Sequence, residues 1–479
     1  MSYQHGVYIN ETPTAVVSPT TSGLIPVVFG TAPVNLSKLD TAPVNEPVLC
    51  HSYAEAVDAF GYSNDWSFTL SEFIYSHFAL YAMSPVVLVN VLDPAVHKAD
   101  ATDQTANVVD RLATIVKQGV IRSSVVVKST GETPVTYASG DDYTLDYDAA
   151  GNLVIQLASG GAAAAATAVV VSYTFADPTA VDADDIIGGI VGGQPTGLEL
   201  LNQVFPRFRQ VPGMVLAPGF SHDPTVAGVM TAKAGNINST FRCIALTDID
   251  PSEAYADVPT WKEDNGYVSP RQVCGYPKLR QGNNIFHFST QLAGVLCATD
   301  AANDGVPYVS PSNKNMQATA AVLADGSPLF LGPDQAAYLN GAGVVTALNF
   351  IGGWKVWGNR TGAYPGNSDP KDSFLPIRRM MDWIGNTIIL TYWQRVDSPI
   401  DRRMTQAVTD SLNIWLNGLA AQGYIIAGRV EFLASDNPDN DLANGIVRFD
   451  VDVTPPSPAE QIHFKLEYDA SQLSGLFAG

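Results

Sequence analysis

The chain has 479 residues, a length that accommodates about three domains. Its 26 Lys and Arg against 47 Asp and Glu give a formal net charge of −21, which argues against a protein that binds nucleic acid or an anionic membrane through its average surface. Hydrophobic residues make up 46%, ample for a large core, while charged residues are only 15%, below the about 25% of an ordinary soluble protein. This balance predicts that much surface is buried, for example between subunits.

Cysteine usage and the apolar segments indicate the compartment. The four cysteines form no CxxC pair and fit neither a zinc site nor a dense disulfide framework, so we expect buried free thiols in a reducing compartment. No basic and apolar leader opens the sequence, and the longest apolar stretch, around 162–171, is far shorter than the roughly 20 residues that span a bilayer. These features predict a soluble protein that is made and kept in a cytoplasm.

The N-terminal part predicts an arm followed by an α/β unit. Val7 and Ile9 alternate with Tyr8 in a short strand, and a loop rich in Thr, Pro and Ser completes an arm of residues 1–22. A buried strand at 24–29, a helix over 64–83 with apolar residues three and four apart, and an apolar strand at 86–89 follow. We assign residues 23–96 to the first part of the core domain.

The pattern changes to β between residues 97 and 185. Strands are predicted at 125–127, 143–147, 153–157 and 169–175, with a turn at 149–152. We interpret this segment as a small antiparallel β domain inserted into the core.

The α/β pattern returns over residues 186–345, the second part of the core domain. Asp223 followed by Pro224 predicts a helix N-terminus, and strands at 214–217 and 241–246 flank that helix. This is a βαβ unit, so the two strands should be parallel. A strand followed by a helix is expected over 285–296.

Residues 346–454 predict a C-terminal domain and residues 455–479 a linker with an arm strand. An amphipathic helix over 400–422 ends at Gly423, and strands are expected at 429–433 and 446–453. A stiff Pro455-Pro456-Ser457-Pro458 linker then carries a last strand, 461–468. The expected fold class is a multidomain α+β or α/β protein, with a mixed core, an inserted antiparallel β domain and extended terminal arm strands that stay unpaired within the chain.

The sequence contains no motif typical of catalysis or of metal or cofactor binding, so no residue is assigned to those roles. The segment 219–223 contains Ser, His and Asp in a row, but adjacent residues cannot form a triad, and a helix cap explains them better. The glycine pairs at 188–193 lack the lysine of a phosphate loop, and the seven histidines form no HxH or HxxxH pair. The acidic runs 182–185 and 436–441 lack the spacing of a calcium loop and are interpreted as solvated turns.

Two further features leave alternatives open. The doubled arginines Arg378-Arg379 and Arg402-Arg403 either form salt bridges on a helix surface or contact an acidic patch of a partner or neighbouring subunit. Five tryptophans concentrate between residues 354 and 415, which fits either a large C-terminal core or an interface, where Trp is enriched.

Three groups of segments resemble the tail sheath proteins of contractile-tailed bacteriophages and of the related R-type bacteriocins. The N-terminal group is 5–11, 29–32 and 47–49, and the middle group is 196–201, 216–219 and 310–314. The C-terminal group contains the most specific signature, followed by 378–379, the long helix and 455–460. The signature residues are Trp357, Gly358, Asn359, Arg360 and Thr361. The resemblance covers nearly the whole chain except the inserted β domain.

The resemblance implies that terminal strands of one subunit add to the C-terminal sheets of neighbouring subunits through main-chain hydrogen bonds. The implied arm residues are Val7, Tyr8, Ile9, Ile462, Phe464, Leu466 and Tyr468. The implied receiving sheet contains Val430, Phe432, Val447, Phe449 and Val451.

The resemblance further implies a structural subunit that polymerises around a tail tube and contracts to drive that tube through the host envelope. The implied partners are copies of the chain in a helical assembly of hexameric rings, the tail tube protein, the baseplate and the tail terminator, with no direct contact to nucleic acid or membrane. No catalytic residue, cofactor or metal is implied. The expected location is the virion tail, after assembly in the host cytoplasm.

Two other classes of protein remain as alternatives. One is a cytoplasmic α/β enzyme, such as a polymer hydrolase with a β accessory domain, which would need an acid–base or nucleophile set that the sequence does not display. The other is a monomeric module whose inserted domain binds a glycan or a receptor. Both predict small discrete particles, whereas a sheath subunit predicts open-ended tubes.

Overall fold

The structure, a computed structural model, describes residues 24–471 and 473. Its largest element is an eight-stranded sheet. The strands are β1 (Ile25–Gly30), β2 (Pro47–Cys50), β3 (Val86–Asn90), β12 (Pro212–Leu216), β13 (Ile244–Asp248), β14 (Gln272–Gly275), β19 (Val344–Asn349) and β20 (Trp354–Trp357). Their order is β2-β3-β1-β12-β13-β14-β19-β20, with parallel pairs from β3 to β19 and antiparallel strands at both edges.

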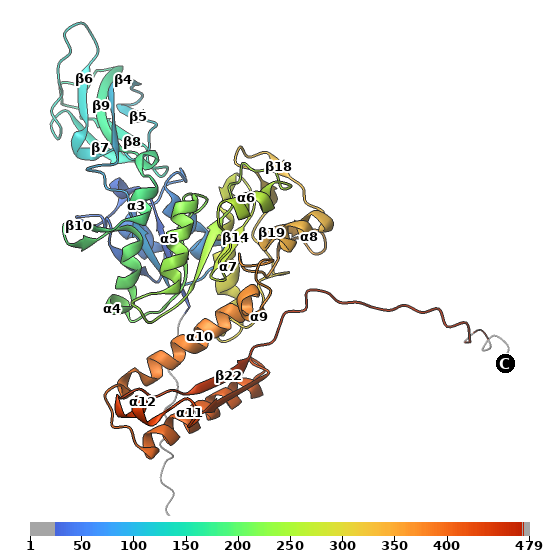
Figure 1. The fold of residues 1–479 in the computed structure, drawn as a ribbon. Coiled ribbons are helices and arrows are strands. Elements are labelled where there is room, and N and C mark those ends of the chain that lie inside the picture. Colours follow the sequence, from blue (N-terminus) through green and yellow to red (C-terminus); the bar gives the residue numbers. More distant parts are fainter. Residues whose placement is uncertain (1–23, 472, 474–479) are drawn as a thin grey trace, which may run out of the picture.

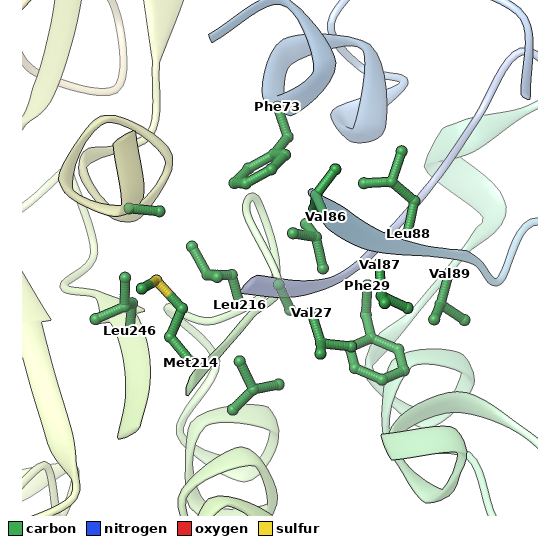
Figure 2. Close-up of a cluster of buried hydrophobic side chains, with 14 of the residues drawn as sticks. Val27, Phe29, Phe73, Val86, Val87, Leu88, Val89, Met214, Leu216 and Leu246 are labelled. Atoms are coloured by element: carbon green, nitrogen blue, oxygen red, sulfur yellow. The ribbon is translucent and has the colours of Figure 1, made fainter. Parts of the chain in front are cut away.

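Helices cover both faces of this sheet, which explains why its strands are apolar runs rather than alternating patterns. The helices of this region are α1 (Tyr53–Phe60), α2 (Thr69–Ile74), the π-helical η2 (Tyr75–Leu80), α3 (Ala183–Ile187), α4 (Val204–Phe208), α5 (Pro224–Gly235), α6 (Val258–Asp264), α7 (Phe288–Ala301), α8 (Pro333–Gly341) and α9 (Pro370–Ser373). Figure 2 shows Phe73 of α2 pointing at the face that carries Val86 and Leu88, while Val87 and Val89 point to the opposite face. All five side chains are fully buried.

The helix expected over 64–83 is shorter and less regular than predicted. Residues 64–68 form a turn because the Asp65 carboxylate accepts the Ser67 amide, at 3.1 Å. The α-helix starts at Thr69, whose amide donates to Thr31 Oγ1 at 3.0 Å, and its last turns are π-helical.

The predicted βαβ unit is confirmed. β12 and β13 are parallel, and α5 connects them. Asp223 caps that helix, with its carboxylate accepting the amides of Thr225 and Val226 at 2.7 and 3.3 Å. The strand and helix expected over 285–296 are also present, as β16 (Asn284–Phe286) and α7.

Short strands and 3-10 helices lie at the border of the core and in the other parts of the chain. The short strands are β10 (Ile190–Val191), β11 (Gln194–Pro195), β15 (Lys278–Gln281), β16 (Asn284–Phe286), β17 (Ala320–Val322) and β18 (Pro328–Leu329). The first two form a hairpin, and the other four form an antiparallel sheet in the order β16-β15-β17-β18. The 3-10 helices are η1 (Val34–Leu36), η3 (Arg122–Ser124), η4 (Pro178–Ala180), η5 (Gly197–Gln203) and η6 (Trp393–Arg395).

The inserted segment forms two three-stranded antiparallel sheets with a core of their own, and it projects from the α/β part of the molecule (Figure 1). Its strands are β4 (Lys98–Asn107), β5 (Leu112–Ile115), β6 (Val126–Ser129), β7 (Tyr143–Tyr147), β8 (Leu153–Leu157) and β9 (Ala168–Ala176). The expected end at residue 185 is too late. α3 packs with α5 and η5, and its Ile186 is buried in the main core, so this helix belongs to the core domain.

The C-terminal part consists of two long helices and a β hairpin. Its elements are α10 (Leu375–Tyr392), α11 (Arg402–Ala421), β21 (Ala427–Glu431), α12 (Asp439–Ala443) and β22 (Asp450–Thr454). The expected boundary at residue 346 is wrong, because it falls inside β19, and β19 and β20 are the last strands of the core sheet. The separate C-terminal core starts in α10, where Met380, Trp383 and Ile384 pack against the apolar side of α11.

The long helix is confirmed almost as expected. Asp401 caps it through the Met404 amide, at 2.6 Å, and Gly423 follows its C-terminus with φ of 80°. All four cysteines are free, three of them buried and Cys297 half-buried. No helix in the described part of the chain is long and apolar enough to cross a membrane.

Candidate assembly surfaces

The β21–β22 hairpin is covered on one face only. Val430 lies opposite Val451, and both pack with α11 in the C-terminal core. Gly428 allows the helix to approach closely, because a Cβ there would lie 3.0 Å from the Leu416 Cβ. The other face carries charged residues, where Arg429 pairs with Asp452 at 2.9 Å and with Glu431 at 3.3 Å.

The two edges of this hairpin differ in their main-chain hydrogen bonds. The Val430 amide donates to Asn413 Oδ1, and the Asn413 Nδ2 donates to the Val430 carbonyl, both at 2.9 Å. The main-chain amide and carbonyl of Val430 therefore point away from β22. The Asn413 side chain, from α11, binds both groups at the middle of the outer edge of β21. In an antiparallel ladder, directly opposite residues behave alike. If the amide and carbonyl of one residue point away from the partner strand, those of the opposite residue also point away from its own partner strand. The amide and carbonyl of Val451 consequently face the outer edge of β22.

The two strands that the resemblance implies as a receiving sheet are shorter than the sequence predicts. Phe432, Val447 and Phe449 lie beyond the ends of β21 and β22 and are half-buried. In this region the Asn437 side chain lies between the segments that follow β21 and precede β22. It accepts a hydrogen bond from the Arg448 amide at 2.7 Å and donates to the carbonyls of Arg448 and Leu433, both at 2.9 Å. These side-chain hydrogen bonds take the place of the main-chain hydrogen bonds that pair β21 with β22. The rings of Phe432 and Phe449, 5.5 Å apart, continue the contact by side-chain packing.

The charged face carries a close pair of carboxyl groups. A hydrogen bond with the Asp436 carboxyl raises the pKa of Asp450, and burial and the negative charges of Asp436, Asp452 and Glu431 act in the same direction. The hairpin therefore exposes an acidic margin along β22.

The C-terminal arm is extended and unpaired in the single chain. Residues 455–469 contain neither strand nor helix, and Figure 1 shows the end of this segment running away from the body of the molecule. The four apolar side chains of the predicted arm strand are strongly exposed. The exposed fractions are 71% for Ile462, 86% for Phe464, 97% for Leu466 and 79% for Tyr468. The N-terminal arm residues Val7, Tyr8 and Ile9 lie outside the described residues.

The signature residues follow the end of β20 and form a rigid corner. Gly358 has φ of 120°, and a Cβ at this position would lie 2.6 Å from Asn340 Nδ2. Asn359 accepts the Leu375 amide at 2.8 Å, and the Thr361 hydroxyl donates to the Asp372 carbonyl at 2.5 Å. These bonds join the core sheet to the start of α10. Arg360 points instead towards the C-terminal arm and bonds Glu460.

The doubled arginines separate into two kinds. Arg378 and Arg379 are buried and pair within the chain, Arg378 with Asp382 at 2.8 Å and Arg379 with Asp300 at 3.0 Å. For Arg378 and Arg379 both expected alternatives are therefore wrong: the pair neither forms salt bridges on an exposed helix surface nor contacts an acidic patch of a partner. Arg402 and Arg403 are exposed in the first turn of α11.

The tryptophans divide between core and surface. Trp383 is 2% exposed and lies 5.7 Å from the Trp415 ring, so both stabilise the C-terminal core. Trp393 is 66% exposed. The expectation that these tryptophans belong to a C-terminal core therefore holds for Trp383 and Trp415 but not for Trp393.

Ser221 and Asp223, from the segment that contains Ser, His and Asp in a row, have structural roles. Ser221 donates to Asp248 at 3.1 Å, and Ser289 donates to the same carboxylate at 2.6 Å, so Asp248 links β13 to α7. A cavity of about 220 Å³ lies nearby, where His222 and His287 are among the lining residues. His287 is bonded to the buried Glu72 at 2.7 Å. The described residues contain no cluster of three or more His, Cys, Asp or Glu suited to a metal ion.

Comparison with known proteins finds relatives in sequence and in fold. No protein family model matches the chain. It is 27% identical over 497 residues to the tail sheath protein of Burkholderia phage BcepMu, with 100% of this chain and 99% of that protein covered. It is 29% identical over 315 residues to a putative prophage major tail sheath protein of Pseudomonas aeruginosa strain UCBPP-PA14, covering 64% of this chain and 77% of that protein.

Solved structures share the fold at low sequence identity. The contracted sheath complex of the extracellular contractile injection system PVC has a TM-score of 0.59 and 15% identity, covering 98% of this chain and 99% of that chain. The contracted helical sheath of the anti-feeding prophage has a TM-score of 0.56 and 16% identity, covering 98% and 100%. Full-length sequence similarity and the shared fold together confirm that this chain resembles the tail sheath proteins of contractile tails.

Proposed function

We propose that this chain is the structural subunit of a contractile tail sheath, which polymerises around a tail tube and contracts to drive the tube through the host envelope. One observation carries the proposal beyond similarity. The same chain presents a two-stranded hairpin with an open edge on β22 and an arm whose alternate side chains are apolar and exposed. If the arm of one copy were added to β22 of another, the main chains of the arm and of β22 would form hydrogen bonds, and the apolar side chains of the arm would be removed from water.

The open edge of β22 is the proposed docking position for an added strand. Val451 offers its amide and carbonyl there, whereas Asn413 already occupies the edge of β21 at Val430. An arm strand that continues the sheet would place one set of alternate side chains beside the apolar inner face. Lys465 and His463 alternate with the apolar residues of the arm and would then face the acidic margin formed by Asp450 and Asp452. The N-terminal arm, with Val7, Tyr8 and Ile9, is proposed to add to the sheets in the same way.

The proposed partners follow from the assembled state. The subunits would form a helical stack of six-fold rings around the tail tube protein, joined to a baseplate at one end and to a tail terminator at the other. The similar structures come from a contracted sheath complex and from a six-fold symmetrised baseplate, which supports self-assembly and baseplate association. The proposed location is the virion tail, after assembly in the host cytoplasm.

Contraction would draw its free energy from rearranged contacts between subunits rather than from catalysis. Sheath proteins similar to this chain are structural subunits, and the residues that resemble catalytic groups in the sequence serve as a helix cap and as links between elements. The inserted domain has its own core and projects from the α/β part of the molecule, so we place it on the outside of the sheath.

The experiment is truncation of the full chain after Pro458, followed by negative-stain electron microscopy. We expect the parent to form hollow tubes and the truncated protein to remain in small folded particles with an unchanged circular dichroism spectrum. A matched control lacks only residues 472–479 and keeps the arm strand, so it should form tubes like the parent. Tubes of normal length from the protein truncated after Pro458 would contradict strand addition by the C-terminal arm.

A further inference from the structure

The segment that links β22 to the arm does not run free from the hairpin. Pro455 is buried and Pro456 and Pro458 are half-buried, whereas every described residue from Ala459 onwards is exposed. The linker borders a groove of about 950 Å³, whose other wall includes Asn340, Tyr308 and the signature residues Trp357 to Arg360. The arm therefore leaves the molecule from the core domain, although its preceding strand belongs to the C-terminal hairpin.

Arg360 holds the linker at the end of this groove. Its Nε donates to Glu460 Oε1 at 2.8 Å and its Nη2 to Glu460 Oε2 at 2.5 Å, a two-point contact across 100 residues of sequence. The planar guanidinium matches a carboxylate in this geometry, and such charged pairs are stronger than neutral hydrogen bonds. Glu460 is the last residue of the linker before the exposed apolar arm.

The guanidinium is held in place by groups other than Glu460. Its carbon lies 3.7 Å from the centre of the Phe374 ring and 4.3 Å from that of Tyr364. Its Nη1 donates to Ser373 Oγ at 3.0 Å, and the backbones of Arg360 and Phe374 form an antiparallel bridge. The Arg360 side chain is only 14% exposed. The core thus presents a preformed cationic slot, and Glu460 is its occupant in the single chain.

We propose that Arg360 and Glu460 form a clasp that fixes the point at which the C-terminal arm leaves the subunit, with Arg360 as a positioning residue for strand addition. The part about strand addition rests on the proposed function. When the clasp is closed, the free arm starts after Glu460. When it opens, the arm starts after the buried Pro455, and five more residues at roughly 3.4 Å each extend its reach by about 17 Å.

The test compares Glu460→Gln with the parent in full-length protein. This change keeps the size of the side chain and removes the charge that Arg360 binds. Arg360 itself is less suitable for substitution, because it also bonds Ser373. Glu132→Gln, at an exposed position of the inserted domain, is the matched control for the loss of one negative charge.

The readout is the distance between spin labels at Ala337→Cys, on the groove, and His463→Cys, on the arm, in a Cys297→Ala background. Labelled protein is diluted into an excess of unlabelled protein so that distances within one chain dominate. We expect a narrow distribution in the parent and in Glu132→Gln. In Glu460→Gln we expect a distribution broadened by roughly the 17 Å of released chain and an increase of about tenfold in the detached population.

Identical distributions in the parent and in Glu460→Gln would overturn the clasp. The measurement does not require tubes, so it separates the two proposals. If the distributions differ but no protein forms tubes, even with its tail tube protein present, the clasp stands and the sheath assignment fails. If tubes form but the distributions are the same, the sheath assignment stands and the clasp fails.

Discussion

In the core sheet, β1, β12, β13 and β14 each have a neighbour on both sides, and helices cover both faces. The β21–β22 hairpin has two strands in the described part of the chain, one covered face and an open edge at Val451. A two-stranded hairpin is marginally stable alone, and unpaired edges attract other strands. The contrast supports the proposal that the core sheet is completed within the chain, whereas the hairpin receives a strand from another copy.

The largest expected effect is on assembly, and it comes from the arm. Leu466→Asp places a charge on a side chain that is 97% exposed in the single chain but would be buried after strand addition. Burial of a leucine stabilises by about 1.5–3 kcal/mol, and this contact recurs at every subunit. We expect tubes to disappear from electron micrographs while the circular dichroism spectrum shows that the subunit is still folded.

Val135→Asp is the control for this substitution. It introduces the same charge at an exposed apolar residue of the inserted domain, and it should leave tube formation intact. Normal tubes from Leu466→Asp would show that the arm is not buried in the assembly.

The second prediction tests which hairpin edge receives a strand. Val451→Pro removes an amide that faces the open edge of β22, and it leaves the ladder with β21 intact because that amide does not pair with β21. We expect loss of tubes with a preserved circular dichroism spectrum.

Val451→Ala keeps the amide and serves as the control, so it should assemble. The assignment to β22 fails if Val451→Pro and Val451→Ala assemble equally well.

The third prediction compares how a substitution in the core and a substitution in the arm change the free energy of unfolding. Phe29 is fully buried in β1, and Phe29→Ala should cost about 3–5 kcal/mol of the free energy of unfolding, because it leaves a cavity between the sheet and its helices. Phe464→Ala, in the exposed arm, should change that free energy by less than about 0.5 kcal/mol. Urea unfolding of the unassembled proteins gives both values. Equal losses would mean that the arm packs on its own subunit.

The smallest expected effect is a difference in acid response. Burial lowers the pKa of His77, in η2, from 6.5 to about 4. The unfolded chain therefore binds this proton first, and the core loses stability as the pH falls from about 6.5 towards 4, by about 2 kcal/mol at pH 5. In the hairpin the pKa of Asp450 is raised by its hydrogen bond with Asp436, so acid favours the folded hairpin as the pH falls through that raised value.

His77→Phe removes the titrating group from the core. Urea unfolding at pH 7 and pH 5 should show a smaller loss of stability in this variant than in the parent. The same loss in both would exclude His77 as a source of the acid sensitivity.

The parts of the fold that depend on local pattern could be predicted from the sequence. Apolar runs identified β1 and β3, the Asp223-Pro224 cap identified α5, and the apolar stripe of 400–422 identified α11. β4 and β5 were not predicted, because most of their side chains are polar or exposed and they lack a clear alternation.

Features that depend on distant residues could not be predicted. The hairpin ends early because Asn437 replaces the ladder at Arg448, a contact that no periodicity reveals. Arg379 is buried because Asp300, 79 residues earlier, neutralises it. The signature containing Arg360 was identified by resemblance, but its contact with Glu460 requires the fold.

The most direct test is a cryo-electron microscopy map of the tubes formed by the purified full-length protein, with its tail tube protein co-expressed if the chain alone does not assemble. We predict that residues 462–468 of one copy lie as an added strand along β22 of another copy. Tubes in which that edge of β22 stays bare, or small discrete particles under both conditions, would contradict the account.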